Sequence, residues 1–233
     1  MRRQVIARQI HNQWVDVMDP FSSERRDMVE TQLRRRGIRD ERVLAAMEKV
    51  PRHLFVPEDL QHRAYWDCPL PIGHGQTISQ PYVVALTCEL LELSSTDSVL
   101  DIGTGSGYAA AILAELAAHI ISIERLPELV QLARDNLAAA GCNNVEVQCA
   151  DGTLGCPDEA PFDAIAVAAA APDVPVSLKA QLKDGGRLVL PVGPSRHLQD
   201  LVRVRRTSKG DFRTDNLGGV AYVPLVGAEG WAD

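Results

Sequence analysis

The stretch GQTISQPY, residues 75–82, holds two hydroxyl side chains, Thr77 and Ser79, in a segment with no acidic or basic residue. A hydrolase serine would require the pattern G-x-S-x-G on a strand-to-helix turn, with a histidine and an acid to follow. Ser79 lacks that pattern and precedes the first strand expected in the main sheet. Two interpretations remain: a hydroxyl that orients a bound group, and a cap for the helix opened by Pro81.

A glycine turn follows in VLDIGTGSGY, where an apolar segment ends at Gly103 and a helical pattern starts after Gly107. In a doubly wound fold this turn lies at the carboxyl end of the first strand, where ligands bind. Its spacing is G-x-G-x-G, with Tyr108 where a dinucleotide fingerprint has its third glycine, and the Walker lysine is absent. The turn therefore disfavours a bound pyrophosphate.

Two acids end the next two expected strands. Glu124 lies 17 residues past Gly107, where a carboxylate can accept both hydroxyls of a ribose. Asp151 is followed by Gly152, which suits an adenine amino group over a closely approaching backbone. Together with the glycine turn, these acids predict an adenosine ligand without a pyrophosphate, S-adenosylmethionine. The alternative is that both acids only cap the helices that follow them.

The surrounding pattern predicts the elements that position these residues. Continuous apolar strands alternate with helices, which indicates an α/β, Rossmann-like, doubly wound and mostly parallel sheet. Two further strands without an intervening helix, 198–208 and 218–227, predict an antiparallel pair at one edge. The other expected strands are 98–103, 119–124, 145–151, 162–170 and 186–192, and the expected helices between them are 107–118, 126–141 and 174–185.

Upstream of the sheet, residues 24–50 have the apolar spacing of two short helices broken at Gly37, with Asp40 as the cap of the second. Residues 50–81 are rich in proline and are expected to be irregular. We therefore divide the chain into an extension of unknown role (1–27), a helical and loop segment on the substrate side (28–97) and an S-adenosylmethionine-binding core (98–233). Residues 28–233 are expected to form one compact unit.

Composition excludes several classes of function. The 24 Lys and Arg against 31 Asp and Glu give a net charge of −7, which argues against a sequence-independent grip on nucleic acid. No apolar run reaches the roughly 20 residues needed to cross a bilayer, and no secretory signal is recognisable. The five cysteines form no C-x-x-C pair and have no histidine at metal-ligand spacing. We expect no metal, reduced thiols and a cytoplasmic protein.

Several motifs, in this order, resemble one enzyme family: MVETQLRRRGIRDERVLAAMEKVPRHLFVP, PLPIGHGQTISQPY, VLDIGTGSGY, APFDAIAVAAAAP, GRLVLPVG and YVPL. They closely resemble the protein-L-isoaspartate O-methyltransferases over about residues 28–227. The resemblance implies methyl transfer from S-adenosylmethionine to the free α-carboxylate of L-isoaspartyl residues, the first step in repairing aged proteins. The products would be a methyl ester and S-adenosyl-L-homocysteine, and the partners would be isoaspartyl-containing peptides and proteins.

The resemblance also assigns roles to residues. Ser79 matches the active-site serine, and Val223 lies within YVPL (222–225), which matches a segment near the substrate peptide. Apart from the resemblance, the hydroxyl of Thr77 is a second candidate to hold the acceptor oxygens. Two departures, Cys156 and Ala168, stand where many bacterial members have tryptophan and threonine. The positions that match cofactor-binding residues are Ile78, Ser79, Gln80, Gly103, Gly105, Ser106, Glu124, Leu129, Asp151 and Gly152.

Two other functions fit the same motifs. One is a class I methyltransferase that acts on a different acceptor. The other is a non-catalytic adaptor that keeps the fold and binds the cofactor or damaged chains. The sequence does not define the oligomeric state, nor which hydroxyl, that of Thr77 or of Ser79, makes the main contact with the acceptor.

Overall fold

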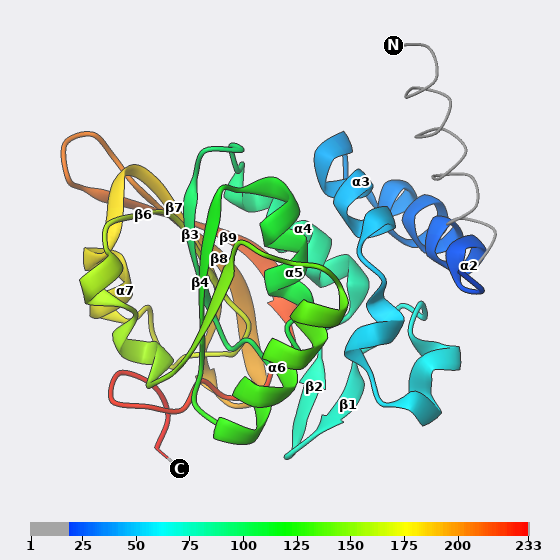
Figure 1. Cartoon of the computed structure of the whole chain (residues 1–233). Coiled ribbons are helices and arrows are strands. Elements are labelled where there is room, and N and C mark those ends of the chain that lie inside the picture. The colour runs from blue at the N-terminus through cyan, green and yellow to red at the C-terminus, as the bar shows by residue number, and fades with distance from the viewer. Residues whose placement is uncertain (1–18, 233) are drawn as a thin grey trace, which may run out of the picture.

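The computed structural model describes residues 19–232, and within them seven strands form one sheet in the order β5-β4-β3-β6-β7-β8-β9 (Figure 1). The first five strands in this order, β5 to β7, are parallel to one another, whereas β8 pairs antiparallel with β7 and β9 pairs antiparallel with β8. This confirms the predicted fold class. The strands are β3 (Ser98–Ile102), β4 (His119–Glu124), β5 (Val145–Cys149), β6 (Phe162–Val167), β7 (Leu182–Ser195), β8 (Leu198–Arg206) and β9 (Phe212–Val220).

Helices cover both faces of the parallel part. Successive strand residues alternate between two cores: Val99 packs in the core of one face and Leu100 in that of the other. This alternation explains why the strands read as continuous apolar runs, since each is buried on both sides. Helices α4 (Pro81–Leu91), α5 (Tyr108–Leu116) and α6 (Pro127–Ala139) lie on one side, and the short α7 (Val176–Ala180) lies on the other (Figure 1).

The N-terminal helices pack beside α4 and α5. A helix formed by α2 (Ser22–Asp27), the π-helical η1 (Met28–Leu33) and η2 (Arg34–Arg36) ends at Gly37, whose φ of 105° is left-handed. The carboxylate of Asp40 then accepts the backbone N–H of Arg42 and caps α3 (Glu41–Lys49). Both short-helix predictions and the Asp40 cap are confirmed. The helix is continuous across residues 27 and 28, while residues 1–18 of the predicted extension lie outside the described residues.

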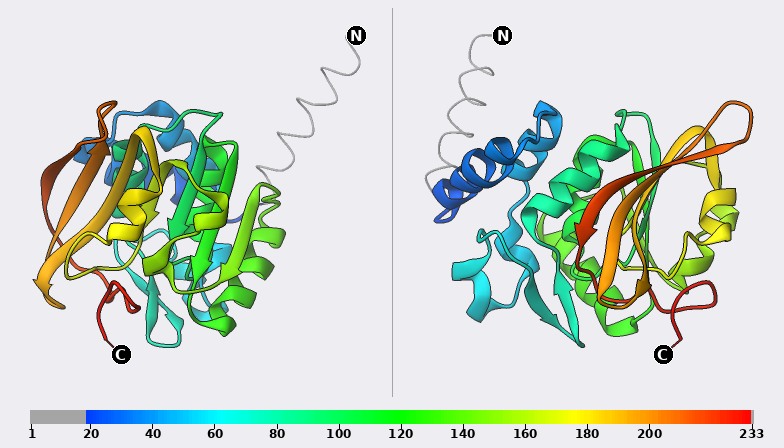
Figure 2. Two further views of the ribbon diagram at one scale, coloured as in Figure 1. Left: turned by 90° about the vertical axis from the view of Figure 1, so that its left-hand side faces the viewer. Right: turned by 180° about the vertical axis from the view of Figure 1, so that it is seen from behind.

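Residues 50–81 contain little regular structure, as predicted. Two 3-10 turns, η3 (Arg52–Phe55) and η4 (Glu58–Arg63), lead to a hairpin of β1 (Leu70–Gly73) and β2 (Gln76–Ile78). This hairpin forms a separate two-stranded sheet. It lies at the same end of the molecule as the C-terminal segment (Figure 2).

The last predicted strand is wrong in its position. The chain pairs with β8 over Phe212–Val220 rather than over 218–227. Pro224 has no N–H to donate to a ladder, and residues 221–226 instead leave β8 and cross the end of the sheet, where Pro224 bridges Ala170. The predicted antiparallel edge pair is therefore correct in kind. The segment YVPL lies outside β9, and part of it lines the pocket described below.

No helix within residues 19–232 is long and apolar enough to span a membrane.

Candidate active site

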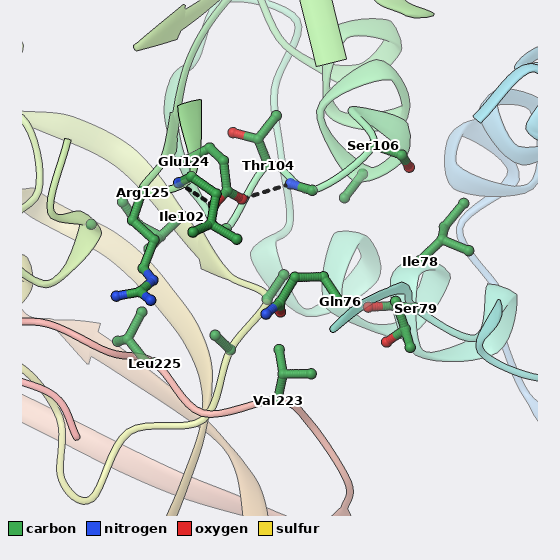
Figure 3. Close-up of a pocket in the computed structure, with 18 of the residues that line it drawn as sticks. Gln76, Ile78, Ser79, Ile102, Thr104, Ser106, Glu124, Arg125, Val223 and Leu225 are labelled. Atoms are coloured by element: carbon green, nitrogen blue, oxygen red, sulfur yellow. Dashed lines mark hydrogen bonds between the residues drawn. The ribbon is translucent and has the colours of Figure 1, made fainter. Parts of the chain in front are cut away.

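A pocket opens at the carboxyl ends of β3, β4 and β6, between the hairpin and the C-terminal segment (Figure 3). Here β3 pairs with β4 on one side and β6 on the other, so the strand order reverses beside it. Open α/β sheets bind their ligands at this kind of switch point. The lining comprises Gln76, Thr77, Ile78, Ser79, Val84, Ile102, Gly103, Thr104, Gly105, Ser106, Tyr108, Ala109, Ile123, Glu124, Arg125, Leu126, Gly152, Ala168, Ala169 and Val223 to Val226.

The glycine turn forms the floor of this pocket. Gly105 has a φ of 54°, a left-handed conformation that is costly for residues with a Cβ. A Cβ there would also lie 3.2 Å from Cδ1 of Ile72, a residue of the hairpin. The side-chain oxygen of Ser106 is buried and has no hydrogen-bond partner among the described residues. The turn thus leaves room for a ligand to lie against the backbone, with an unused hydroxyl beside it.

Glu124 is the last residue of β4 and faces the glycine turn. Its Oε2 accepts the N–H of Gly105 at 3.0 Å and its Oε1 accepts the N–H of Leu126 at 3.0 Å (Figure 3). Only 7% of the residue is exposed. The two bonds fix the carboxylate while each oxygen keeps a second lone pair. Glu124 therefore fixes the turn between β4 and α6 without capping the helix, whose N-cap Leu126 has no side-chain cap hydrogen bond, and it presents two acceptors to the pocket.

Asp151 behaves differently from Glu124, although it also follows a strand. Its Oδ1 accepts the N–H and the hydroxyl of Thr153 at 2.9 and 2.7 Å, and its Oδ2 accepts the N–H of Ala228 at 2.8 Å. Burial acts to raise the pKa of Asp151, but the bonds from Ala228 and Thr153 outweigh it and hold the pKa below its usual value. Asp151 caps η5 (Gly152–Leu154) and ties down the C-terminal segment, and its neighbour Gly152 lines the pocket.

The acceptor side of the pocket comes from the hairpin and the C-terminal segment. Thr77, Ile78 and Ser79 line it together with Val223, which faces them across the opening (Figure 3). The backbone carbonyl of Ser79 accepts Nη2 of Arg52 at 2.8 Å, and Arg52 is completely buried. Ser79 does not cap α4, because the N-cap there has no side-chain hydrogen bond.

Some predicted positions lie outside the pocket. Gln80 lies in a wide groove that continues from Ser79, and its amide donates to the carbonyl of Asp67. Leu129 is fully buried in α6 and supports the pocket from behind. Of the two departures, Ala168 lines the pocket and the groove, whereas Cys156 is buried elsewhere. The roles assigned to the individual residues stay predictions.

Asp101 is a residue that the sequence reasoning missed. It is 1% exposed within β3 and accepts the hydroxyl of Ser122 at 2.6 Å through Oδ2, while its Oδ1 has no partner among the described residues. Burial raises the pKa of Asp101 to about 6. An acid inside the apolar run VLDIG was the signal available in the sequence.

The pocket contains no metal site within residues 19–232: no group of three His, Cys, Asp or Glu side chains is placed to hold an ion there. His53 instead contacts the hydroxyl of Tyr65 at 2.8 Å.

Comparison with known proteins decides the family. The sequence profile described as protein-L-isoaspartate(D-aspartate) O-methyltransferase matches residues 23–230. The protein-L-isoaspartate O-methyltransferase of Methanoculleus marisnigri is 60% identical over 213 residues, which cover 91% of this chain and 96% of that protein. Protein-L-isoaspartate O-methyltransferase 2 of Marinobacter nauticus is 59% identical over 211 residues, with coverage of 91% and 96%. The chain belongs to the protein-L-isoaspartate(D-aspartate) O-methyltransferase family.

Solved structures of the family share the fold. A protein-L-isoaspartate O-methyltransferase superposes with a TM-score of 0.77 at 26% identity, over 88% of this chain and 67% of that one. A putative protein-L-isoaspartate O-methyltransferase from Plasmodium falciparum, in complex with S-adenosyl-L-homocysteine, gives 0.75 at 28% identity over 87% and 98%. The predicted resemblance to this methyltransferase family is confirmed.

Proposed function

We propose that this chain transfers a methyl group from S-adenosylmethionine to the α-carboxylate of L-isoaspartyl residues in damaged peptides and proteins. Family membership over nearly the whole chain supports this reaction. The observation that carries it in this structure is the fixed carboxylate of Glu124 beside the glycine turn, with the hydroxyl-bearing hairpin on the other side of the same pocket.

The pocket residues fit S-adenosylmethionine. Glu124 offers two fixed acceptors for ribose hydroxyls, and Gly105 and Gly152 present backbone without a side chain to the pocket. Ser106 offers a buried hydroxyl to the polar amino-acid end of the ligand. The bound sulfonium supplies an electrophilic methyl carbon and a good leaving group. No residue of the chain has to become covalently attached.

The acceptor side needs no general base. A carboxylate with a pKa near 4 is ionised about a thousand to one at pH 7, so the nucleophile arrives already charged. The chain has to align it with the methyl group, and well-oriented reactions gain roughly 7 to 11 kcal/mol in this way. Ser79 donates its O–H to one carboxylate oxygen, and Thr77 lies beside it for the other. Neutral donors hold the carboxylate without quenching its nucleophilicity as Arg or Lys would.

A groove accommodates the rest of the peptide. It leads away from Thr77, Ser79 and Val223 toward the edge strands β8 and β9. Because the residues that line the pocket also line the start of this groove, a chain lying in it can present one carboxylate to the methyl group. We place this activity in the cytoplasm, in keeping with five cysteines that are all unpaired.

The test compares two synthetic peptides that differ only in an isoaspartyl or an aspartyl residue. With labelled S-adenosylmethionine we expect a base-labile methyl ester on the first and almost none on the second. Equal labelling of both peptides would refute the assignment, and a base-stable product on nitrogen or a hydroxyl would indicate a different acceptor. Cofactor binding without any turnover would indicate an adaptor.

A further inference from the structure

Ser79 can act as an oriented donor only if its own hydroxyl is held. The bond from Arg52 fixes the backbone of Ser79, but it does not set the direction of the side-chain O–H. Beside Ser79 lies a second, small cavity lined by apolar residues of α4, α5 and β6. Its polar side chains are Ser79, Thr87, Asp101 and Tyr222.

Tyr222 reaches this cavity from the C-terminal segment. The segment is extended, so consecutive side chains point to opposite sides: Val223 faces the main pocket, and Tyr222 faces the small cavity. The ring of Tyr222 is partly exposed at the groove, whereas its buried hydroxyl end lies in the cavity together with the hydroxyl side chains of Thr87 and Ser79. Burial raises the pKa of Tyr222 to about 12, so the hydroxyl keeps its proton at neutral pH.

One side chain, that of Gln199, binds both backbone polar groups of Tyr222. Gln199 of β8 is 4% exposed; its Oε1 accepts the N–H of Tyr222 at 2.8 Å, and its Nε2 donates to the carbonyl of Tyr222 at 3.1 Å. The pairing between β8 and β9 ends at Val220, and beyond that residue the side-chain amide of Gln199 takes the place of backbone hydrogen bonds. This amide fixes the backbone position from which the side chain of Tyr222 enters the cavity.

We propose that Tyr222 is a positioning residue for Ser79: its O–H donates to Oγ of Ser79, so that the single O–H of Ser79 points to the acceptor carboxylate. Thr87 completes the chain by donating to the oxygen of Tyr222. Donors in series polarise one another, which strengthens the last O–H. The catalytic part of this inference rests on the proposed function, whereas the hydrogen bond itself does not.

The first experiment measures turnover in a double-mutant cycle. We expect Tyr222→Phe to lower kcat about tenfold, the equivalent of one oriented hydrogen bond, with little change in the dissociation constant of the cofactor. In a Ser79→Ala background the same substitution should cause no further loss. A similar loss in both backgrounds, or unchanged kcat in the single variant, would overturn the proposal.

The matched control removes a different buried tyrosine hydroxyl. Tyr65 bonds to Arg25 and His53 in the N-terminal region, away from the pocket. Tyr65→Phe should lower the melting temperature while leaving kcat unchanged, which separates a loss of stability from a loss of positioning. Thr87→Val should give a smaller loss of kcat than Tyr222→Phe, since it removes only the outer donor.

A second readout does not depend on turnover. In Ser79→Cys, a hydroxyl that donates to position 79 stabilises the thiolate, so the pH profile of alkylation by iodoacetamide reports the contact directly. Adding Tyr222→Phe should raise the apparent pKa of the thiol by about one unit, a tenfold change in the ionisation constant. An unchanged profile would overturn the hydrogen bond even in an active enzyme. A shifted profile with no activity on isoaspartyl peptides would count against the proposed function alone.

Discussion

The two walls of the pocket are built in different ways. The cofactor wall consists of strand ends and the turns that follow them, and its carboxylate, that of Glu124, is held by backbone N–H groups of Gly105 and Leu126. The acceptor wall consists of a hairpin and a C-terminal segment, and distant side chains, Arg52 and Gln199, hold it. Recognition of the cofactor is therefore encoded locally, whereas placement of the acceptor depends on long-range contacts.

The largest effect is expected at the cofactor wall. Glu124→Ala removes both acceptors for the ribose and leaves two backbone N–H groups without their partner, so we expect cofactor binding to weaken by on the order of 3 to 4 kcal/mol. Titration calorimetry with S-adenosylmethionine measures this. Asp151→Ala is the matched comparison, and it should weaken binding less because the oxygens of Asp151 are engaged by Thr153 and Ala228. The reverse order would contradict the contrast between these two acids.

The next effect is expected at the acceptor wall. Ser79→Ala removes an oriented donor, so kcat should fall, with a rise in the activation free energy of up to about 3 kcal/mol. The affinity for the cofactor should stay nearly intact. Steady-state kinetics on the isoaspartyl peptide, together with calorimetry, separate the two quantities. If turnover is unchanged, Thr77 rather than Ser79 makes the decisive contact, and Thr77→Val then becomes the variant that loses activity.

Asp101, buried in β3 and lining the small cavity beside Ser79, makes the stability of the protein depend on pH. Burial raises its pKa to about 6, so the folded protein binds this proton more tightly than the unfolded chain does. The resulting stabilisation is complete below about pH 4 and is lost as the pH rises through about 6, on the order of 3 kcal/mol. Asp101→Asn should remove this part of the pH dependence. Denaturant unfolding of both proteins from pH 4 to 7 tests it, and parallel curves would argue against the buried proton.

The smallest effect is expected where the walls touch. Gly105→Ala introduces a Cβ at a left-handed φ and 3.2 Å from Ile72 of the hairpin, and we expect a loss of about 1 to 2 kcal/mol in stability. Gly75→Ala is the control, since Gly75 is also left-handed but has nothing within 4 Å. Both variants should lose stability, but only Gly105→Ala should also weaken cofactor binding. Equal affinities would show that the walls act independently.

The same contrast explains what could be predicted from the sequence. The parallel strands, the glycine turn, the Asp40 cap and the position of Glu124 follow from local patterns. The structure has them where expected, except that β7 begins at Leu182, inside the helix predicted over 174–185. The strand predicted at 218–227 failed because alternation alone does not reveal that Pro224 ends pairing. The partners of Asp151 could not be foreseen either, since Ala228 lies 77 residues away along the chain.

The contacts that hold the acceptor wall also join residues far apart in the sequence, and local patterns do not predict them. Arg52 meets Ser79 across 27 residues and Gln199 meets Tyr222 across 23, and no periodicity encodes such pairs. Leu129 was assigned to the cofactor site by the resemblance alone, and the structure places its side chain in the core. The division into segments at residues 27 and 97 stays a prediction.

The hairpin of β1 and β2 is paired only with itself, and among the described residues no strand of the large sheet extends its ladder. Its links to the rest of the pocket are side-chain contacts, such as Ile72 beside Gly105 and Arg52 beneath Ser79. Leu70, Ile72 and Ile78 of the hairpin are buried in the main core. The place of the acceptor hydroxyls relative to Glu124 is therefore set by side-chain packing rather than by strand pairing.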